Sequence, residues 1–271
     1  MSKIEWTDKT WNVITGCTQV SPACQNCYAK ALTKRLQGMA KKGCKGAEKY
    51  IKGWDEVEFH TDMLGHIFNF NKYHSGHKVF VNSMSDTFHD KVSYSHLKML
   101  FNVMGARKDI TFQVLTKREM RMYAFLTEHT ELLTPNICVG VTAENQAMVD
   151  KRVDWLVYMK TEVKRFANKD IKIFVSCEPL LEYLDLSAYI NELDWVILGG
   201  ERANKKGRVM EFEWVKSLYE QCKEASTPFF FKQWGDCEKI VKDSLKGDDE
   251  ILAKAIENTK DFPNFKQKGG K

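Results

Sequence analysis

Residues 137–142 read Ile-Cys-Val-Gly-Val-Thr, and this apolar run decides the fold class. It is continuous rather than alternating, which is typical of a parallel strand buried on both faces. Similar runs occur at residues 11–14 (WNVI), 78–82 (KVFVN), 111–115 (TFQVL), 173–176 (IFVS), 195–199 (WVILG) and 228–231 (PFFF). Amphipathic stretches with helical spacing lie between them, at residues 95–106, 118–128, 145–163 and 211–225.

Strands that alternate with helices indicate βαβ units and a parallel sheet. The sequence therefore predicts an α/β fold, a full or partial (β/α) TIM-type barrel of about 6–8 parallel strands. An open doubly wound sheet is the alternative. Residues 1–235 are the expected barrel, and the change of composition after Asp236 predicts a C-terminal helical extension over residues 236–271.

The composition is that of a globular protein, with 271 residues, 43% hydrophobic residues and a net charge of +5. This charge suits a polyanionic partner without requiring one. The sequence lacks an apolar signal segment and a membrane-spanning stretch of about 18 residues, so we expect a cytoplasmic protein without a membrane partner. In that reducing compartment the eight cysteines are not expected to form a disulfide framework.

Three cysteines are clustered in the stretch TGCTQVSPACQNCYAK at residues 15–30. Cys17, Cys24 and Cys27 have the spacing C-x6-C-x2-C. Three thiolates can each hold one iron of a [4Fe-4S] cluster, which leaves the fourth iron open to a small molecule. A zinc site completed by Cys44 or a histidine is the alternative, since Cys-x2-Cys is also a zinc-binding pair. The spacing alone leaves both open.

Residues 16–30 resemble the cluster loop of radical S-adenosylmethionine (SAM) enzymes, above all Cys24-Gln-Asn-Cys27-Tyr-Ala-Lys30. The branch they resemble contains spore photoproduct lyase. Over residues 4–235 the chain also resembles a phage-associated family named for its three-cysteine motif. The matching pieces are residues 4–7 (IEWT), 11–12 (WN), 15–17 (TGC), 82–86 (NSMSD), 115–118 (LTKR), 199–201 (GGE) and 230–235 (FFKQWG).

The resemblance implies two cofactors, a [4Fe-4S] cluster and SAM, which together generate a 5′-deoxyadenosyl radical. It also implies a reductant such as flavodoxin or ferredoxin. The implied substrate is a thymine-derived base in DNA, or a modified nucleotide, that an isomerase or lyase reaction rearranges, modifies or repairs; a phage enzyme would act in the host cytoplasm. Two alternatives stay open: a radical SAM enzyme acting on a small molecule, and a zinc-stapled, non-catalytic nucleic-acid-binding protein.

Polar residues follow the predicted strands, and the carboxyl ends of barrel strands form the active-site face. The resemblance places the methionine amino group of SAM near Ser83, Ser85 and Asp86, although Ser and Asp are also ordinary helix caps. Lys117 and Arg118 suit a carboxylate or a substrate phosphate, and Lys117 is a catalytic candidate beside the cysteines. The other expected cofactor residues are Thr142, Glu144, Glu178, Gly199, Gly200 and Glu201.

Substrate contacts are expected from Arg118, Arg202, Lys232, Gln233 and Trp234, where Trp234 offers a stacking face or simply caps the barrel. Two lysine-rich segments indicate nucleic-acid binding or plain solvated surface: residues 30–52 and the stretch Lys205-Lys206-Gly-Arg208. The histidines show no paired metal-binding spacing, and His89 is a weak site candidate.

Overall fold

The computed structural model describes residues 4–263, and its centre is a seven-stranded sheet in the order β1-β4-β5-β6-β7-β8-β9. All six neighbouring pairs are parallel. The spatial order follows the chain order, and β1 and β9 form the two margins, so the sheet is a half-barrel as predicted. The strands are β1 (Lys9–Trp11), β4 (Lys78–Val81), β5 (Thr111–Thr116), β6 (Ile137–Thr142), β7 (Lys172–Cys177), β8 (Trp195–Gly199) and β9 (Phe229–Gln233).

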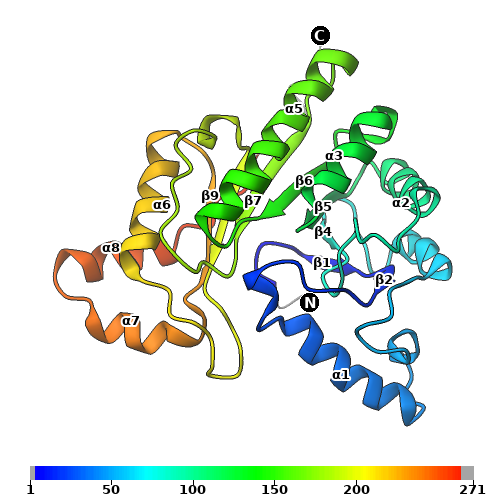
Figure 1. Ribbon diagram of the computed structural model, residues 1–271, viewed down its shortest axis with the longest axis horizontal. Coiled ribbons are helices and arrows are strands. Elements are labelled where there is room, and N and C mark those ends of the chain that lie inside the picture. Colours follow the sequence, from blue (N-terminus) through cyan, green and yellow to red (C-terminus); the bar gives the residue numbers. More distant parts are fainter. Residues whose placement is uncertain (1–3, 264–271) are drawn as a thin grey trace.

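The predicted amphipathic stretches are helices on the outside of this sheet (Figure 1). They are α2 (Tyr94–Ala106), α3 (Glu119–Glu128), α5 (Asp154–Ala167) and α6 (Phe212–Glu224). The third stretch is not one regular helix: α4 (Gln146–Met148) and a π-helical segment, η5 (Val149–Val153), come before α5. Short 3-10 turns occur after α3, η4 (Thr130–Leu132), and between β7 and β8, η6 (Ile190–Glu192).

A long insertion separates β1 from β4. It contains β2 (Ile14–Thr15), η1 (Pro22–Cys24), α1 (Tyr28–Lys41), η2 (Glu48–Tyr50), β3 (Glu58–Phe59) and η3 (Thr61–Phe68). The strand predicted at residues 11–14 is wrong in its bounds, because β1 ends at Trp11 and β2 pairs antiparallel with β3. The cause is Asn82, whose Oδ1 accepts the backbone N–H groups of Val13 and Ile14 at 2.9 and 3.1 Å.

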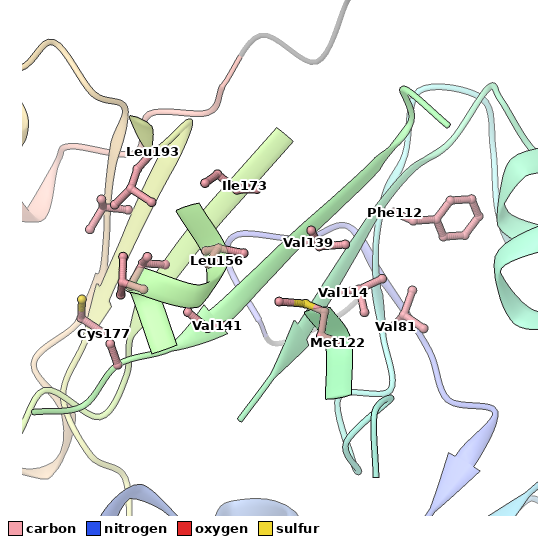
Figure 2. Close-up of a cluster of buried hydrophobic side chains, with 14 of the residues drawn as sticks. Val81, Phe112, Val114, Met122, Val139, Val141, Leu156, Ile173, Cys177 and Leu193 are labelled. Atoms are coloured by element: carbon pink, nitrogen blue, oxygen red, sulfur yellow. The ribbon is translucent and has the colours of Figure 1, made fainter. Parts of the chain in front are cut away.

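The outer face of the sheet packs against the helices (Figure 2). Alternate strand residues such as Val81, Val114 and Val139 point outward because side chains alternate along a strand. They meet apolar side chains of the covering helices, including Met122 of α3 and Leu156 of α5. Burying both faces of the strands explains why their sequences are continuous apolar runs.

Aromatic side chains fill the inner face of the half-barrel on the side away from the carboxyl ends of the strands. Trp6, Phe80, Phe174, Trp195 and Phe230 belong to one buried cluster. A Cβ at position 140 would lie 2.5 Å from the Phe174 carbonyl oxygen, so glycine in β6 makes room for its neighbour. This aromatic cluster fills one part of the half-barrel, and the open space lies toward the carboxyl ends of the strands.

The chain after residue 235 is helical, as predicted, with η7 (Gly235–Cys237), α7 (Glu238–Ser244) and α8 (Asp248–Glu257). Beyond α8 the chain returns to β9: Phe231 N–H donates to the Thr259 carbonyl, and Asp261 N–H donates to the Phe229 carbonyl, both at 3.0 Å. The proposed domain boundary at residue 235 stays a prediction, and residues 264–271 of the predicted extension lie outside the described residues. No helix within residues 4–263 is long and apolar enough to cross a membrane.

Candidate active site

A cavity of about 700 Å³ lies at the carboxyl ends of the strands, which is a size typical of ligand sites. Its walls come from the strand ends, the start of α1 and residues 17–27, here called the cysteine loop. The structure brings most of the predicted site residues to it: Cys17, Cys24, Cys27, Ser83, Ser85, Asp86, Lys117, Thr142, Glu178, Gly200, Glu201, Arg202, Lys232 and Gln233. Arg118, Glu144, Gly199 and Trp234 are not part of this lining.

The cysteine loop starts from a close backbone approach. Gly16 has a φ of +78°, and a Cβ there would lie 2.1 Å from the Glu56 carbonyl oxygen. Only glycine tolerates both conditions. The next residue, Cys17, donates its N–H to the Trp54 carbonyl at 2.9 Å. Cys24 ends η1, and Cys27 caps α1, so local structure sets the position of each cysteine.

The three thiols share one environment and influence one another. Burial raises the pKa of Cys17 to about 12, with further upward contributions from Asp86, Cys24 and Cys27 and a downward one from Arg118. Cys17 is therefore a neutral thiol near neutral pH when no metal is bound. A metal ligand must be a thiolate, so metal binding here releases a proton from Cys17.

The three cysteines line one cavity, where they could serve a cluster or a single metal ion. Within residues 4–263, no three His, Cys, Asp or Glu side chains converge closely enough to hold one metal ion. Cys44 cannot complete a zinc site with Cys27, because the 14 residues of α1 separate them by about 20 Å. A [4Fe-4S] cluster would bind each thiolate on a different iron, so it would not require all three thiols to meet at one ion.

Glu144 holds the cysteine loop from the end of β6. Its side chain is fully buried. One carboxylate oxygen accepts the Ala23 N–H at 3.1 Å, and the other accepts Arg152 Nη1 at 2.9 Å. Arg152 is itself only 2% exposed and also donates to the Thr142 carbonyl at 2.8 Å. Both Glu144 oxygens are thus engaged with protein groups, and the predicted role of Glu144 in binding the cofactor is not supported by its position.

Glu201 holds the same loop from the end of β8. Its Oε2 accepts Asn26 Nδ2 and both the N–H and Nε of Arg208, each at 2.9 Å. Arg208 also donates to the Pro22 carbonyl at 3.1 Å. Burial opposes ionisation of Glu201, but the hydrogen bonds from Arg208 and Asn26 lower its pKa overall. Glu201 and Arg208 therefore form an ion pair that holds the second half of the cysteine loop in place.

Arg118 holds the first half of the cysteine loop, and Asp86 joins the strand ends beside it. Arg118 Nη2 donates to Thr18 Oγ1 at 2.8 Å, so this cation contacts the loop beside Cys17. Asp86 accepts Thr116 Oγ1 at 2.6 Å and the Lys117 N–H at 3.0 Å, which ties the end of β4 to the end of β5. Asp86 is neither the cap of α2, which is Ser93, nor a side chain without partners.

The inner wall offers the groups that are available to a ligand. Lys117 lines the cavity, and no ion pair engages its ammonium within residues 4–263. Glu178 and Lys232 face each other across Gly199 and form an ion pair. Ser85 is less available, because its hydroxyl donates to the Ile14 carbonyl at 2.9 Å. Within residues 4–263, the lining thus combines two cations without an ion-pair partner, Lys117 and Arg202, with the Glu178–Lys232 ion pair.

Trp234 does not offer a stacking face to the cavity. It is 1% exposed, packs against Phe231 and Phe212, and donates its Nε1 to Glu257. Its backbone crosses Gly200, where a Cβ would lie 2.1 Å from the Trp234 carbonyl oxygen. The ring is thus buried in the described conformation, and the substrate contact predicted for Trp234 stays a prediction.

A family model described as "Protein of unknown function (DUF5131)" matches residues 1–260. The chain belongs to this family. No characterised protein matches it at the level of sequence. Among solved structures, a cysteine-to-serine mutant of spore photoproduct lyase is similar, with 11% identity, a TM-score of 0.47, and coverage of 84% of this chain and 75% of that one. A tyrosine-to-phenylalanine mutant has 10% identity, a TM-score of 0.47, and coverage of 81% and 74%.

A third similar structure is a double mutant of the same lyase with bound AdoMet and dinucleoside spore photoproduct; it has 11% identity, a TM-score of 0.45, and coverage of 84% and 75%. At these values the likeness is distant. The chemistry of the site is therefore derived from the side chains of this chain.

Several residues that shape the site had no clear signal in the sequence. Arg152 lies in the middle of a helical stretch, and only its burial beside Glu144 reveals its role. Asn26 lies between two cysteines and reads as an ordinary loop residue. Tyr28 follows Cys27, and its hydroxyl donates to the Ser83 carbonyl at 2.6 Å, which joins α1 to the end of β4. The polar residues within the cysteine motif were the available signal for these contacts.

Proposed function

We propose that the protein is a radical SAM enzyme, with a [4Fe-4S] cluster on Cys17, Cys24 and Cys27 and SAM in the adjoining cavity. The observation that carries this proposal is the position of the three cysteines on one loop in the wall of a single large cavity. The resemblance of residues 16–30 to a radical SAM cluster loop supports it. Bound together, these cofactors supply a carbon-centred radical that removes hydrogen from a substrate.

The residues of the chain then have distinct tasks. The three thiolates bind iron and leave one iron without a protein ligand. Lys117, which lines the cavity and has no ion-pair partner within residues 4–263, binds the carboxylate of SAM. Glu178 and Lys232 offer an acceptor and a donor to the ribose or the substrate. The cysteine loop and the buried aromatic cluster of the inner face exclude water, which protects a reactive species from side reactions.

We infer that the substrate is a thymine-derived base in DNA, rearranged, modified or repaired by isomerase- or lyase-type chemistry. The net charge of +5 supports a polyanionic substrate. An external reductant such as flavodoxin or ferredoxin supplies the electron, and the enzyme works in the cytoplasm, that of the host if a phage encodes it. A base in a duplex must leave the stack to reach a cavity of this depth.

The first test is anaerobic purification and reconstitution with iron and sulfide, followed by an iron assay and an absorption spectrum near ~400 nm. We expect a brown protein with about four irons that cleaves SAM under a reductant. Cys24→Ala should lose the colour. Cys44→Ala is the matched control, because Cys44 lies beyond the far end of α1 and should leave the iron content unchanged.

A colourless protein that binds one zinc per chain would overturn the proposal. Equal loss of iron in both cysteine variants would also contradict the assignment of the ligands. A brown protein that does not cleave SAM would retain the cluster and refute the radical SAM activity.

A further inference from the structure

Residues 202–207, here called the rim loop, follow β8 beside the cavity and are held together by one carboxylate oxygen of the partly buried Asp236. Asp236 Oδ2 accepts the N–H groups of Ala203 and Gly207 at 2.7 and 3.1 Å. Partial burial opposes ionisation of Asp236, but the N–H groups of residues 203 and 205–207 lower its pKa overall. This carboxylate therefore organises the loop from within.

The rim loop has an unusual backbone. Asn204 and Lys205 have φ values of 52° and 66°, so two consecutive non-glycine residues are left-handed. Such residues are costly, and they persist where surrounding contacts impose them, often at functional sites. The hydrogen bonds to Asp236 are those contacts. They hold the loop so that the side chains of Lys205 and Lys206 project into solvent.

Three cations of the rim loop are available to a ligand. Lys205 and Lys206 are exposed and form no ion pair within residues 4–263. Arg202 is exposed, lines the cavity, and uses only its Nε, which donates to Gln233 Oε1 at 3.0 Å. Arg208 differs from them, because it turns inward to Glu201. The stretch Lys205-Lys206-Gly-Arg208 therefore does not act as one group of exposed cations, and the third exposed cation of the rim loop is Arg202.

The carboxylates that contact this region do not cancel its charge toward solvent. Arg208 pairs with Glu201, and Asp236 keeps its negative charge while it accepts backbone N–H groups, so the three cations Arg202, Lys205 and Lys206 exceed it by two charges. The rim loop is therefore a positively charged edge of a cavity whose lining includes both charged and apolar side chains. Figure 1 shows the chain after β8 running out as a long loop before α6, so a ligand bound there can extend away from the barrel.

We propose that Arg202, Lys205 and Lys206 bind backbone phosphates of a nucleic-acid strand, one base of which enters the cavity. This inference rests on the proposed function and adds to it a site on a polymer. Arg202 contacts a phosphate next to the entering base, because it reaches both the rim and the cavity. Lys205 and Lys206 contact the following phosphates as point charges, which gives affinity without reading sequence.

The test is the salt dependence of binding to a short, fluorescein-labelled, thymine-rich single strand, followed by anisotropy. In Lys205→Gln/Lys206→Gln, two lost phosphate contacts should reduce the slope of log K against log salt by about 1.4. Between 50 and 200 mM salt, the wild type should then lose about seven-fold more affinity than the variant. Lys239→Gln/Lys246→Gln is the control, since these lysines are also exposed and unpaired within residues 4–263 but lie after η7.

A second variant sets the geometry of the loop against its charge. Asp236→Asn keeps every lysine and removes a negative charge, which by itself would strengthen binding to phosphates, so weaker binding is expected only if the hydrogen bonds to Asp236 position the lysines. Equal slopes for the lysine variant and the control would overturn the rim-loop site. Equal affinity for thymidine monophosphate and for the strand would overturn the polymer. Absence of salt-dependent binding by a wild type that still gains thermal stability from SAM would refute this inference and leave the proposed enzyme class standing.

Discussion

Replacing Glu144 by Gln tests whether a buried charge holds the cysteine loop. The carboxylate is fully buried and meets Arg152, which is 2% exposed, at 2.9 Å. Removing one partner of a buried ion pair costs about 3–5 kcal/mol. The amide keeps one acceptor, and Arg152 retains the Thr142 carbonyl and Glu119, whose Oε2 lies 3.6 Å from its Nε. We therefore expect the lower end, a loss of about 3 kcal/mol.

For a chain of this length, 1 kcal/mol shifts the melting temperature by about 2–4 °C, so the expected decrease for Glu144→Gln is about 6–12 °C. Calorimetry or dye-monitored melting of the metal-free protein measures it. The control is Glu250→Gln, which breaks an exposed pair with Lys254, 52% and 68% exposed, and should cost under about 1 kcal/mol.

The coupling of the pair is tested by Glu144→Gln/Arg152→Gln. Because the double variant removes both charges, it should lose less stability than the sum of the single variants. Glu144→Gln should also retain less iron after reconstitution, since the Ala23 N–H competes with Arg152 for one remaining acceptor. A melting temperature within 1–2 °C of the control, about the effect of an exposed pair, would show that this ion pair does not hold the loop.

Three further predictions follow from single positions. Gly140→Ala should destabilise by more than about 1 kcal/mol in denaturant unfolding, because its Cβ would lie 2.5 Å from the Phe174 carbonyl; an unchanged midpoint would contradict the close packing. Gly38→Ala, in α1 with open space around it, should stabilise by about 0.5–1 kcal/mol, and a loss would contradict the helix. The hydrogen bond from Arg107 holds the pKa of Asp109 below its ordinary value, so the charged form stabilises the folded state above that value. Asp109→Asn should be less stable than wild type near neutral pH, and this difference in unfolding free energy should shrink as the pH falls through the lowered pKa of Asp109. A difference that is independent of pH would refute this.

The fold was largely readable because each strand carries its own local signal. Runs such as residues 137–142 are continuous because helices and the barrel interior bury both faces. The first strand was misplaced for a non-local reason. Asn82, about 70 residues away, takes the N–H groups that a longer β1 would have used. A pattern within residues 11–14 cannot show that competition.

The site was readable as a place but less well as a set of roles. Residues after parallel strands had to meet at one edge, and most of them line the cavity. The sequence could not show which oxygens already have partners. Glu144 and Glu201 each accept a hydrogen bond from the cysteine loop and are each paired with an arginine, Arg152 of η5 and Arg208 after β8. The sequence alone could not show that Trp234 is buried, because its burial comes from packing against Phe212 and Phe231. The ring therefore also read as a stacking face.

The return of residues 259–261 to the margin of β9 has a consequence for the solution behaviour of the protein. An open half-barrel leaves strand edges whose N–H and C=O groups could pair with another molecule. Here the segment after α8 occupies two positions on β9, and Lys260 reaches Glu5 at 2.9 Å on the N-terminal segment. Trimming the chain before residue 259 would uncover that edge and invite intermolecular strand addition. Residues 259–261 thus cover the edge of β9 against pairing with another molecule.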